Sequence, residues 1–147
     1  MIALGCDHGG LELKESIKKY LDNNNVKYKD FGVQTCESVD YPSIAKLVCN
    51  AVISGDCEKA LLFCGTGVGM SIVANKVNGI RAACCSDSFS AKYTRLHNNA
   101  NVLCLGGRVV GAGLATELVD LFINTEYEGG RHQIRVDQIT KIEQEKI

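Results

Sequence analysis

The chain has 147 residues with a formal net charge of −1, and 46% of its residues are hydrophobic. This length and composition predict a single domain, residues 1–147, with a sizeable core, while the near-neutral charge excludes a broad basic surface for nucleic acid or an anionic membrane. We also expect no signal peptide, because residues 1–10 carry no positively charged start, and no apolar run approaches the roughly 18 residues that span a bilayer.

Apolar runs of strand length alternate with segments whose apolar residues recur at helical spacing. In chain order, these patterns predict strand 2–6, helix 11–24, strand 26–31, helix 43–54, strand 60–64, helix 70–76, strand 80–85, helix 88–96, strand 102–107, helix 112–124 and a last helix at about 131–146. The single proline, Pro42, falls at an expected helix start, where its missing N–H costs little.

Most of the expected strands are apolar throughout, as is typical of a sheet that is covered on both faces. Regular strand–helix alternation predicts parallel strands joined by right-handed crossovers. We therefore predict an α/β fold, a three-layer doubly wound sandwich with a five-stranded parallel sheet, helices on both faces and a C-terminal helix.

Eight cysteines lie at positions 6, 36, 49, 57, 64, 84, 85 and 104. Most fall inside apolar runs, where a free cysteine packs as a small hydrophobe. The even count would suit a disulfide framework, but the chain is long and shows no secretion signal. We expect a reduced, cytoplasmic protein.

Small, polar and ionisable residues follow the expected strands, in 6-CDHGG-10, 64-CGTGVG-69, 86-SDS-88 and 106-GGR-108. Ligands of doubly wound sheets bind beyond the carboxyl ends of the strands, so these segments predict a binding site at one edge. Gly65, Gly67 and Gly69 before a helix suit an anion cradle of backbone N–H groups, or else a tight turn that needs glycine for packing. Met70 replaces the next glycine of the dinucleotide fingerprint.

Cys64 falls between an apolar strand and this glycine loop. A thiol beside a helix N-terminus has a pKa below its free value of about 8.5 and can act as a nucleophile or a general base. The alternative is a buried structural thiol, as we expect for most of the other cysteines.

Two further groups of residues carry possible chemistry. Arg131 and Arg135 are four residues apart, on one face of the expected helix, and suit either a phosphate or a solvated surface paired with Glu126 or Glu128. His97 is expected in a loop before a strand, as a proton carrier or a structural histidine.

Candidate metal ligands are also present, namely Asp7, His8, His97 and His132. Neither H-x-x-x-H spacing nor a carboxylate ladder links them, so we predict no metal.

Seven segments together resemble the type B ribose-5-phosphate isomerases, a family that includes the galactose-6-phosphate isomerase subunits. They are 5-GCDHGG-10, 40-DYP-42, 64-CGTGVG-69, 75-NKVNGIRA-82, 95-RLHNNANVL-103, 107-GRVVG-111 and 127-YEGGRHQIRV-136. The resemblance covers essentially the whole chain. It implies a Rossmann-like sandwich and a homodimer, sometimes paired into tetramers, with active sites shared between subunits and no cofactor.

The resemblance also implies a role for each site residue. Cys64 would move a proton between C1 and C2 of the open-chain sugar phosphate, with Thr66 and the backbone N–H groups of Gly65, Gly67 and Gly69 holding the enediolate. His97 would help to open the sugar ring. The remaining contacts would come from Asp7 and Tyr41 to sugar hydroxyls, from His8, Arg131 and Arg135 to the phosphate, and from Arg108 and Asn98 elsewhere in the site.

Departures from the family pattern bear on the subtype. Met70 stands where one branch carries a glutamate base, which places this chain with the cysteine branch. Both the C-G-T and the G-G-R-H-Q motifs are present, which favours a homo-oligomer over a heteromeric partner. Ile44 replaces a common aromatic residue, and Ile134 a common polar one. Ile44 leaves open a six-carbon substrate such as allose 6-phosphate or galactose 6-phosphate. A non-catalytic sugar-phosphate-binding module is the further alternative.

Overall fold

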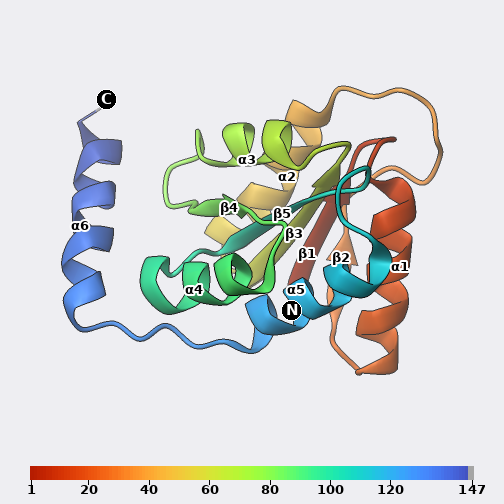
Figure 1. Cartoon of the computed structure of the whole chain (residues 1–147). Helices are drawn as coiled ribbons and strands as arrows, with labels where there is room; N and C mark the ends of the chain where they lie inside the picture. Colours follow the sequence, from red (N-terminus) through yellow and green to blue (C-terminus); the bar gives the residue numbers. More distant parts are fainter. Residues whose placement is uncertain (146–147) are drawn as a thin grey trace.

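The computed structural model describes residues 1–145 and shows three layers, with helices on both faces of a central sheet (Figure 1). In chain order, the elements are β1 (Ile2–Cys6), α1 (Leu11–Asn23), β2 (Tyr28–Asp30), α2 (Tyr41–Ile53), β3 (Lys59–Cys64), α3 (Val68–Ala74), β4 (Ala82–Cys84), α4 (Ser88–Asn98), β5 (Val102–Gly106), α5 (Ala112–Asn124) and α6 (Arg131–Gln144). None of the helices in the described part of the chain is long and apolar enough to cross a membrane.

The five strands lie in the order β2-β1-β3-β5-β4, and every neighbouring pair is parallel, which confirms the predicted sheet. Alternate residues of β3 point to opposite faces, as the period of a strand requires. Leu61 and Phe63 pack with α1, α4 and α5, whereas Leu62 and Cys64 pack with α2 and α3. Two buried apolar layers therefore hold the sheet, and the Cys64 side chain belongs to the α2–α3 side.

The expected boundaries differ from the observed ones mainly at helix ends. α2 and α3 each begin two residues earlier than expected, and β2 and β4 are shorter. The expected end of the last helix at 146 lies outside the described residues.

The prediction of a loop around His97 is wrong, because α4 continues through Asn98 and His97 lies in its last turn. Asn99 takes a left-handed conformation (φ 47°) as the C-cap and donates its N–H to the Arg95 carbonyl. Asparagine tolerates this conformation, so this residue ends the helix rather than marking a longer loop.

α6 stands apart from the three layers (Figure 1). It packs against α4, and its buried residues are His132 and Val136. Ile134, Ile139 and Ile142 are exposed on it. The arrangement leaves an apolar helix surface that the rest of the described chain does not cover.

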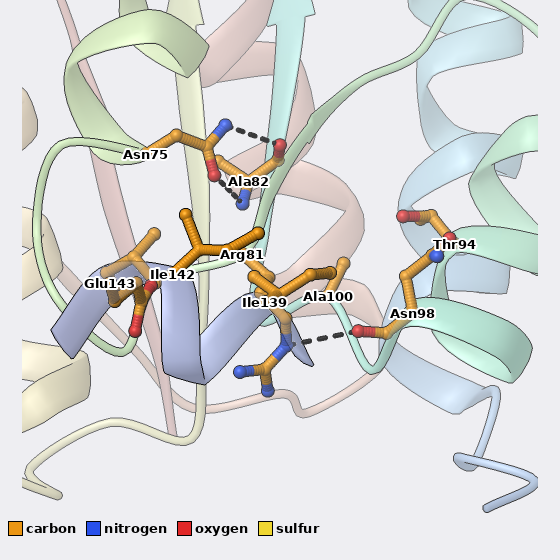
Figure 2. Close-up of a pocket in the computed structure, with 10 residues that line it drawn as sticks. Asn75, Arg81, Ala82, Thr94, Asn98, Ala100, Ile139, Ile142 and Glu143 are labelled. Atoms are coloured by element: carbon orange, nitrogen blue, oxygen red, sulfur yellow. Dashed lines mark hydrogen bonds between the residues drawn. The ribbon is translucent and has the colours of Figure 1, made fainter. Parts of the chain in front are cut away.

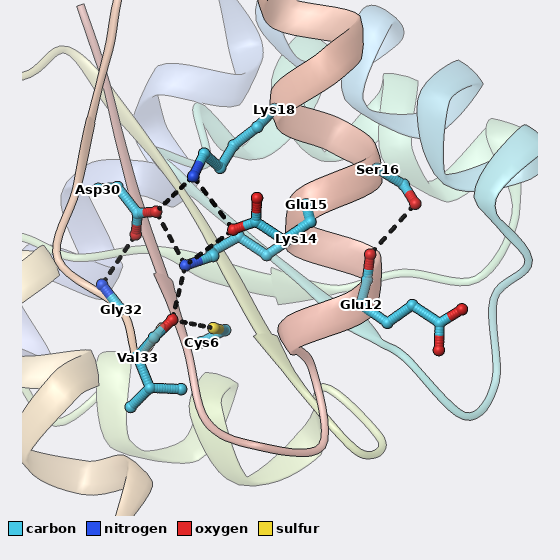
Figure 3. Close-up of polar contacts among 9 residues, drawn as sticks. All are labelled: Cys6, Glu12, Lys14, Glu15, Ser16, Lys18, Asp30, Gly32 and Val33. Atoms are coloured by element: carbon cyan, nitrogen blue, oxygen red, sulfur yellow. Dashed lines mark hydrogen bonds and ion pairs between the residues drawn. The ribbon is translucent and has the colours of Figure 1, made fainter. Parts of the chain in front are cut away.

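A buried lysine fixes the start of the loop between β2 and α2 (Figure 3). The Lys14 side chain is fully buried, and its Nζ lies 2.8 Å from Asp30 Oδ2 and 2.9 Å from the Val33 carbonyl oxygen. Asp30 also accepts the Gly32 N–H, at 2.9 Å. Burial alone would raise the pKa of Asp30, but the hydrogen bonds from Lys14 and Gly32 outweigh it, so the net shift is downward. The charge on Lys14 is thus fully paired, as burial requires.

We expect Lys14→Met to lower the free energy of unfolding by about 3 kcal/mol, because it leaves the mostly buried Asp30 carboxylate with a weaker partner. The matched control is Lys18→Met, which removes a more exposed partner of the same carboxylate, 3.2 Å away. That change should cost under about 1 kcal/mol. Urea unfolding measures both values, and equal losses would contradict the assigned role of Lys14.

Candidate active site

Three loops meet at the carboxyl edge of the sheet, after β1, β3 and β5. The Gly107 N–H donates to the Cys64 carbonyl at 2.8 Å, and the Arg108 N–H donates to the Gly65 carbonyl at 3.0 Å. At Gly106 the glycine loop also approaches closely, since a Cβ there would lie 2.6 Å from the backbone carbon of Thr66. The glycine loop therefore lies directly across the end of β5, and a larger residue at 106 would displace it.

Cys64 is the last residue of β3 and is 5% exposed. The Gly67 N–H donates to its Sγ at 3.1 Å. Gly67 has φ 80°, in the left-handed region that favours glycine, and is the N-cap of α3. A backbone N–H directed at sulfur stabilises negative charge there. The arrangement equips this sulfur to act as a base.

Two other predicted residues, Thr66 and Tyr41, lie in or against the glycine loop. Thr66 is exposed, and its Oγ1 accepts the Val68 N–H at 3.3 Å. The Tyr41 ring lies against Gly69, where an added Cβ would be 2.9 Å from the tyrosine hydroxyl oxygen. This part of the edge therefore presents one hydroxyl from the loop and one from the start of α2.

Asp7 and His8 follow β1. The buried Asp7 carboxylate accepts the Gly9 and Gly10 N–H groups at 2.8 and 3.1 Å, which fixes its orientation. His8 Nδ1 accepts the Val39 N–H at 3.4 Å. A neutral imidazole that accepts at Nδ1 carries its proton on Nε2, so His8 offers a donor on its other side.

His8 and Arg108 line a pocket of about 420 Å³ between the N-termini of α1 and α5. The Arg108 guanidinium also lies over Gly65, since a Cβ at 65 would be 3.4 Å from its Nη1. One cationic side chain thus reaches from the pocket to the glycine loop. A donor histidine and an arginine suit an anionic group there.

The remaining predicted residues gather at the junction of α4 and α6. The His97 ring stacks on the His132 ring with centroids 4.0 Å apart and planes at 10°, and it meets Tyr93 edge-on at 4.9 Å. Arg131 and Arg135 are exposed, one turn apart on α6. Asn98 ends α4 beside His97, and its carbonyl accepts the Arg81 Nε at 3.0 Å.

A single chain does not bring these two groups together. Figure 1 shows α6 at the opposite side of the sheet from α1, whose N-terminus borders the His8 pocket. Thr66 and Cys84 line a pocket of about 250 Å³ that includes neither His97 nor the arginines of α6. Cys84 also lines the pocket of His97. Cys64, at the end of β3, and the predicted arginines, on α6, therefore lie in separate parts of one chain.

Figure 2 shows another pocket, of about 400 Å³, between α6 and the edge strand β4. Asn75 exchanges two hydrogen bonds with the Ala82 backbone there, and Arg81 is held by backbone carbonyls near Asn98. Because these polar groups already form hydrogen bonds with the backbone, they stabilise the fold, and we assign this pocket no binding role.

Two side chains at the junction, Glu128 and His132, were expected only as a surface partner of the arginines and as a candidate metal ligand, not as parts of a sugar-phosphate site. Glu128 Oε2 lies 3.7 Å from His97 Nε2 and 3.6 Å from His132 Nε2. Burial lowers the pKa of His132, helped by the positive charges of His97 and Arg131. The i,i+4 spacing of Glu128 and His132 was the available sequence signal, but their shared contact with His97 is a tertiary feature.

Only His97, Glu128 and His132 in residues 1–145 form a group with metal-ligating atoms close together, within 4.8 Å of one another. The lone pair of an imidazole lies in the ring plane. Because the two rings are stacked nearly parallel, their lone pairs do not converge on one point. Joint metal coordination would require one ring to turn, so this arrangement does not fit a metal site.

The other thiols and Ile44 have structural surroundings. Burial raises the pKa of the Cys49 and Cys85 thiols to about 11, so they pack as neutral groups at neutral pH. All eight cysteines are free. Ile44 is buried in the core of α2 against Gly5, rather than exposed to a pocket. Its identity therefore gives no direct reason for a wider substrate pocket.

Residues 2–139 match the sequence profile of the Ribose/Galactose Isomerase family. The chain belongs to this family. It is 50% identical over 145 residues to ribose-5-phosphate isomerase B of Escherichia coli, a match that covers 99% of this chain and 97% of that protein. The membership makes the protein a sugar-phosphate isomerase rather than a non-catalytic binding module.

Two other relatives show the extent of the likeness. The structure of Clostridium thermocellum ribose-5-phosphate isomerase B matches this isomerase with a TM-score of 0.97 and 48% identity, over 99% of each chain. The D-erythrulose-4-phosphate isomerase of Pectobacterium atrosepticum is 42% identical, over 94% of this chain and 91% of that protein. The fold is thus shared with relatives whose named substrates differ in length.

We expect Gly106→Ala to lower both stability, by about 2 kcal/mol, and isomerase activity, because the new methyl group would collide with the Thr66 backbone. Gly113→Ala is the matched control, since no atom lies within 4 Å of a Cβ there and the residue is helical. It should be neutral or stabilising by about 0.5 kcal/mol. Urea unfolding and a sugar-phosphate assay test both variants, and unchanged activity of Gly106→Ala would contradict the proposed contact.

Proposed function

We propose that this isomerase interconverts ribose 5-phosphate and ribulose 5-phosphate through an enediolate, with Cys64 as the base and without a metal ion. The observation that carries the proposal is the position of the Cys64 sulfur at the carboxyl edge, with the Gly67 N–H directed at it. The E. coli and C. thermocellum relatives, both named ribose-5-phosphate isomerase B, support the choice of sugar.

The reaction requires one base and a set of donors. In the open-chain aldose, the base removes the proton on C2, a C1–C2 double bond forms, and negative charge develops on O1. Return of the proton to C1 and transfer of the O2 hydroxyl proton to O1 leave a ketone at C2. Cys64 supplies the base in this scheme, and the Thr66 hydroxyl and the N–H groups of residues 65–69 stabilise the oxyanion.

The remaining predicted residues hold the sugar phosphate. Asp7 and Tyr41 bind sugar hydroxyls beside the glycine loop, and the Nε2 donor of His8 and the guanidinium of Arg108 bind anionic oxygens from their shared pocket. A grip on the phosphate keeps the flexible sugar still while C1 and C2 face the sulfur.

The second part of the site comes from a second copy of the chain. In one chain, α6 lies away from the His8 pocket (Figure 1), so His97, Asn98, Arg131 and Arg135 complete the site of a partner in a homodimer. The exposed isoleucines of α6 and the exposed Leu47, Val68 and Ile72 of the α2–α3 side are apolar surfaces that such a dimer can bury. Sedimentation velocity measures whether the dimers pair further into tetramers.

A six-carbon aldose phosphate remains the second candidate substrate, because the family's named activities include galactose and a four-carbon sugar phosphate. A panel of ribose 5-phosphate, allose 6-phosphate and galactose 6-phosphate, assayed with and without a chelator, ranks these substrates and tests the metal-free mechanism. The eight free thiols support a reducing, cytoplasmic location.

We expect Cys64→Ala to lower kcat by about a hundredfold or more, because the variant has no group to accept the C2 proton. Binding of the phosphate and the unfolding midpoint should stay close to those of the unchanged protein. Conversion is followed by NMR, and binding by calorimetry with a non-isomerisable sugar phosphate.

Cys57→Ala is the matched control, since Cys57 is also a buried thiol but precedes β3 at the opposite end of that strand. It should keep nearly full activity. Substantial turnover by Cys64→Ala would remove the cysteine from the mechanism.

A mixing experiment tests the shared site. We expect Cys64→Ala and the double variant Arg131→Ala/Arg135→Ala to be inactive separately. After unfolding and refolding together, random pairing restores roughly a quarter of the activity, because each mixed dimer has one intact site. No recovery, with mixed dimers demonstrated by mass spectrometry, would mean that the arginines and the cysteine act in the same chain.

A further inference from the structure

The segment between α5 and α6 places one carboxylate beside the ring-opening histidine of the proposed function. The Glu128 N–H donates to the Leu96 carbonyl at 3.1 Å, which fixes this residue to the last turn of α4, next to His97. From there, Glu128 Oε2 faces the Nε2 atoms of both stacked histidines at 3.6 to 3.7 Å. The backbone anchor keeps the main chain of Glu128 next to His97, so its side chain, which is 60% exposed, reaches both rings from a fixed starting point.

The two faces of the His97 ring have different neighbours. His132 lies flat against one face, and the Tyr93 ring meets His97 edge-on. Tyr93 is itself stacked on Phe89, at 4.1 Å. These contacts hold the ring plane but do not determine which nitrogen occupies which side. A negative charge near Nε2 can determine this, because the charge favours the ring orientation and the tautomer that direct an N–H toward the carboxylate.

His132 provides a buried ring against which the His97 ring stacks. Its side chain is 7% exposed, and its buried Nε2 has no hydrogen-bond partner in the described part of the chain. A neutral imidazole at this position avoids charge repulsion with His97. Glu128 is the one carboxylate in residues 1–145 that faces both rings, so it supplies the negative charge at this junction.

Ring opening is a separate step from proton transfer at C2. In a furanose, the C1–O4 bond breaks, the O1 hydroxyl loses its proton, a C1=O1 carbonyl forms, and O4 receives a proton. A single imidazole that takes the proton from O1 and delivers one to O4 must keep a defined orientation. Carboxylates orient histidines in this way in other enzymes.

We propose that Glu128 is a positioning residue for His97 and serves the opening of the sugar ring, not the proton transfer at Cys64. This inference rests on the proposed function. It separates two classes of substrate by their chemistry: ribose 5-phosphate is mainly a furanose and must be opened, whereas ribulose 5-phosphate cannot form a furanose, because its C5 oxygen carries the phosphate.

The test is Glu128→Gln, which keeps the size of the side chain and removes its charge. We expect kcat for ribose 5-phosphate to fall about tenfold or more, while kcat for ribulose 5-phosphate stays within about twofold of the unchanged protein. Open-chain ribose 5-phosphate released in the second assay cyclises in solution without the enzyme. Glu128→Asp, which retains the charge, should recover part of the lost rate.

Glu126→Gln is the matched control, because it removes an equal charge from an exposed position two residues away. It should leave both rates unchanged. The ¹H–¹⁵N spectra of the three histidines give a readout that does not depend on turnover. The His97 tautomer preference should weaken in Glu128→Gln and not in Glu126→Gln.

The outcomes separate the two proposals. If the unchanged protein converts neither sugar, the proposed substrate is wrong. If it converts both, and Glu128→Gln loses rate equally on both or on neither, the positioning role of Glu128 is overturned while the isomerase assignment stands.

Discussion

The close approach of the Thr66 backbone to Gly106 is the constraint on which the catalytic edge depends. A strand neighbour without a side chain lets the loop after β3 lie across the end of β5. The Gly107 N–H then holds the Cys64 carbonyl, and the left-handed Gly67 turns its own N–H toward the sulfur. The donor that the loop directs at the sulfur is therefore a backbone N–H, which is positioned more rigidly than a side chain and needs no ionisation to donate.

Buried polar groups in this protein are divided between holding the chain and facing a ligand. Lys14 and Asp30 form a buried ion pair that holds the start of a long loop, while one carboxylate oxygen of Asp7 accepts both N–H groups of the turn that carries His8. At the α4–α6 junction the satisfaction is incomplete, because His132 Nε2 is buried without a hydrogen-bond partner in residues 1–145. An unsatisfied polar atom costs stability and is typical of a place where function, not packing, selects the residue.

Much of the fold could be predicted from the sequence because the strands are continuous apolar runs and the helices between them have a clear period. The carboxyl edge followed from the same pattern, because parallel strands all end on one side, and the sequence therefore predicted Asp7, Cys64 and Arg108 at one edge. Helix ends were less predictable. The asparagines after His97 indicated a loop, whereas one of them caps a helix that includes the histidine.

The junction at α6 could not be predicted for a different physical reason. The contact of Glu128 with His97 joins positions 31 residues apart through the path of a linker, and no local periodicity encodes such a path. The separation of the arginines from the sulfur is likewise a matter of which way α6 leaves the domain. The family resemblance implied a site shared between subunits, but no motif encodes the path of α6 that separates the arginines from the sulfur within one chain.

The outward course of α6 has a consequence for how activity would depend on synthesis. A freshly made polypeptide carries Cys64 at the end of β3 and the arginine pair on α6, which stands apart from the sheet (Figure 1). In the proposed scheme, a single unpaired copy is therefore inactive. Turnover would then grow with the square of protein abundance when copies are scarce, and linearly once nearly all of them are paired. An activity assay on a sample with little of this protein would thus detect almost no turnover, even though the polypeptide is present.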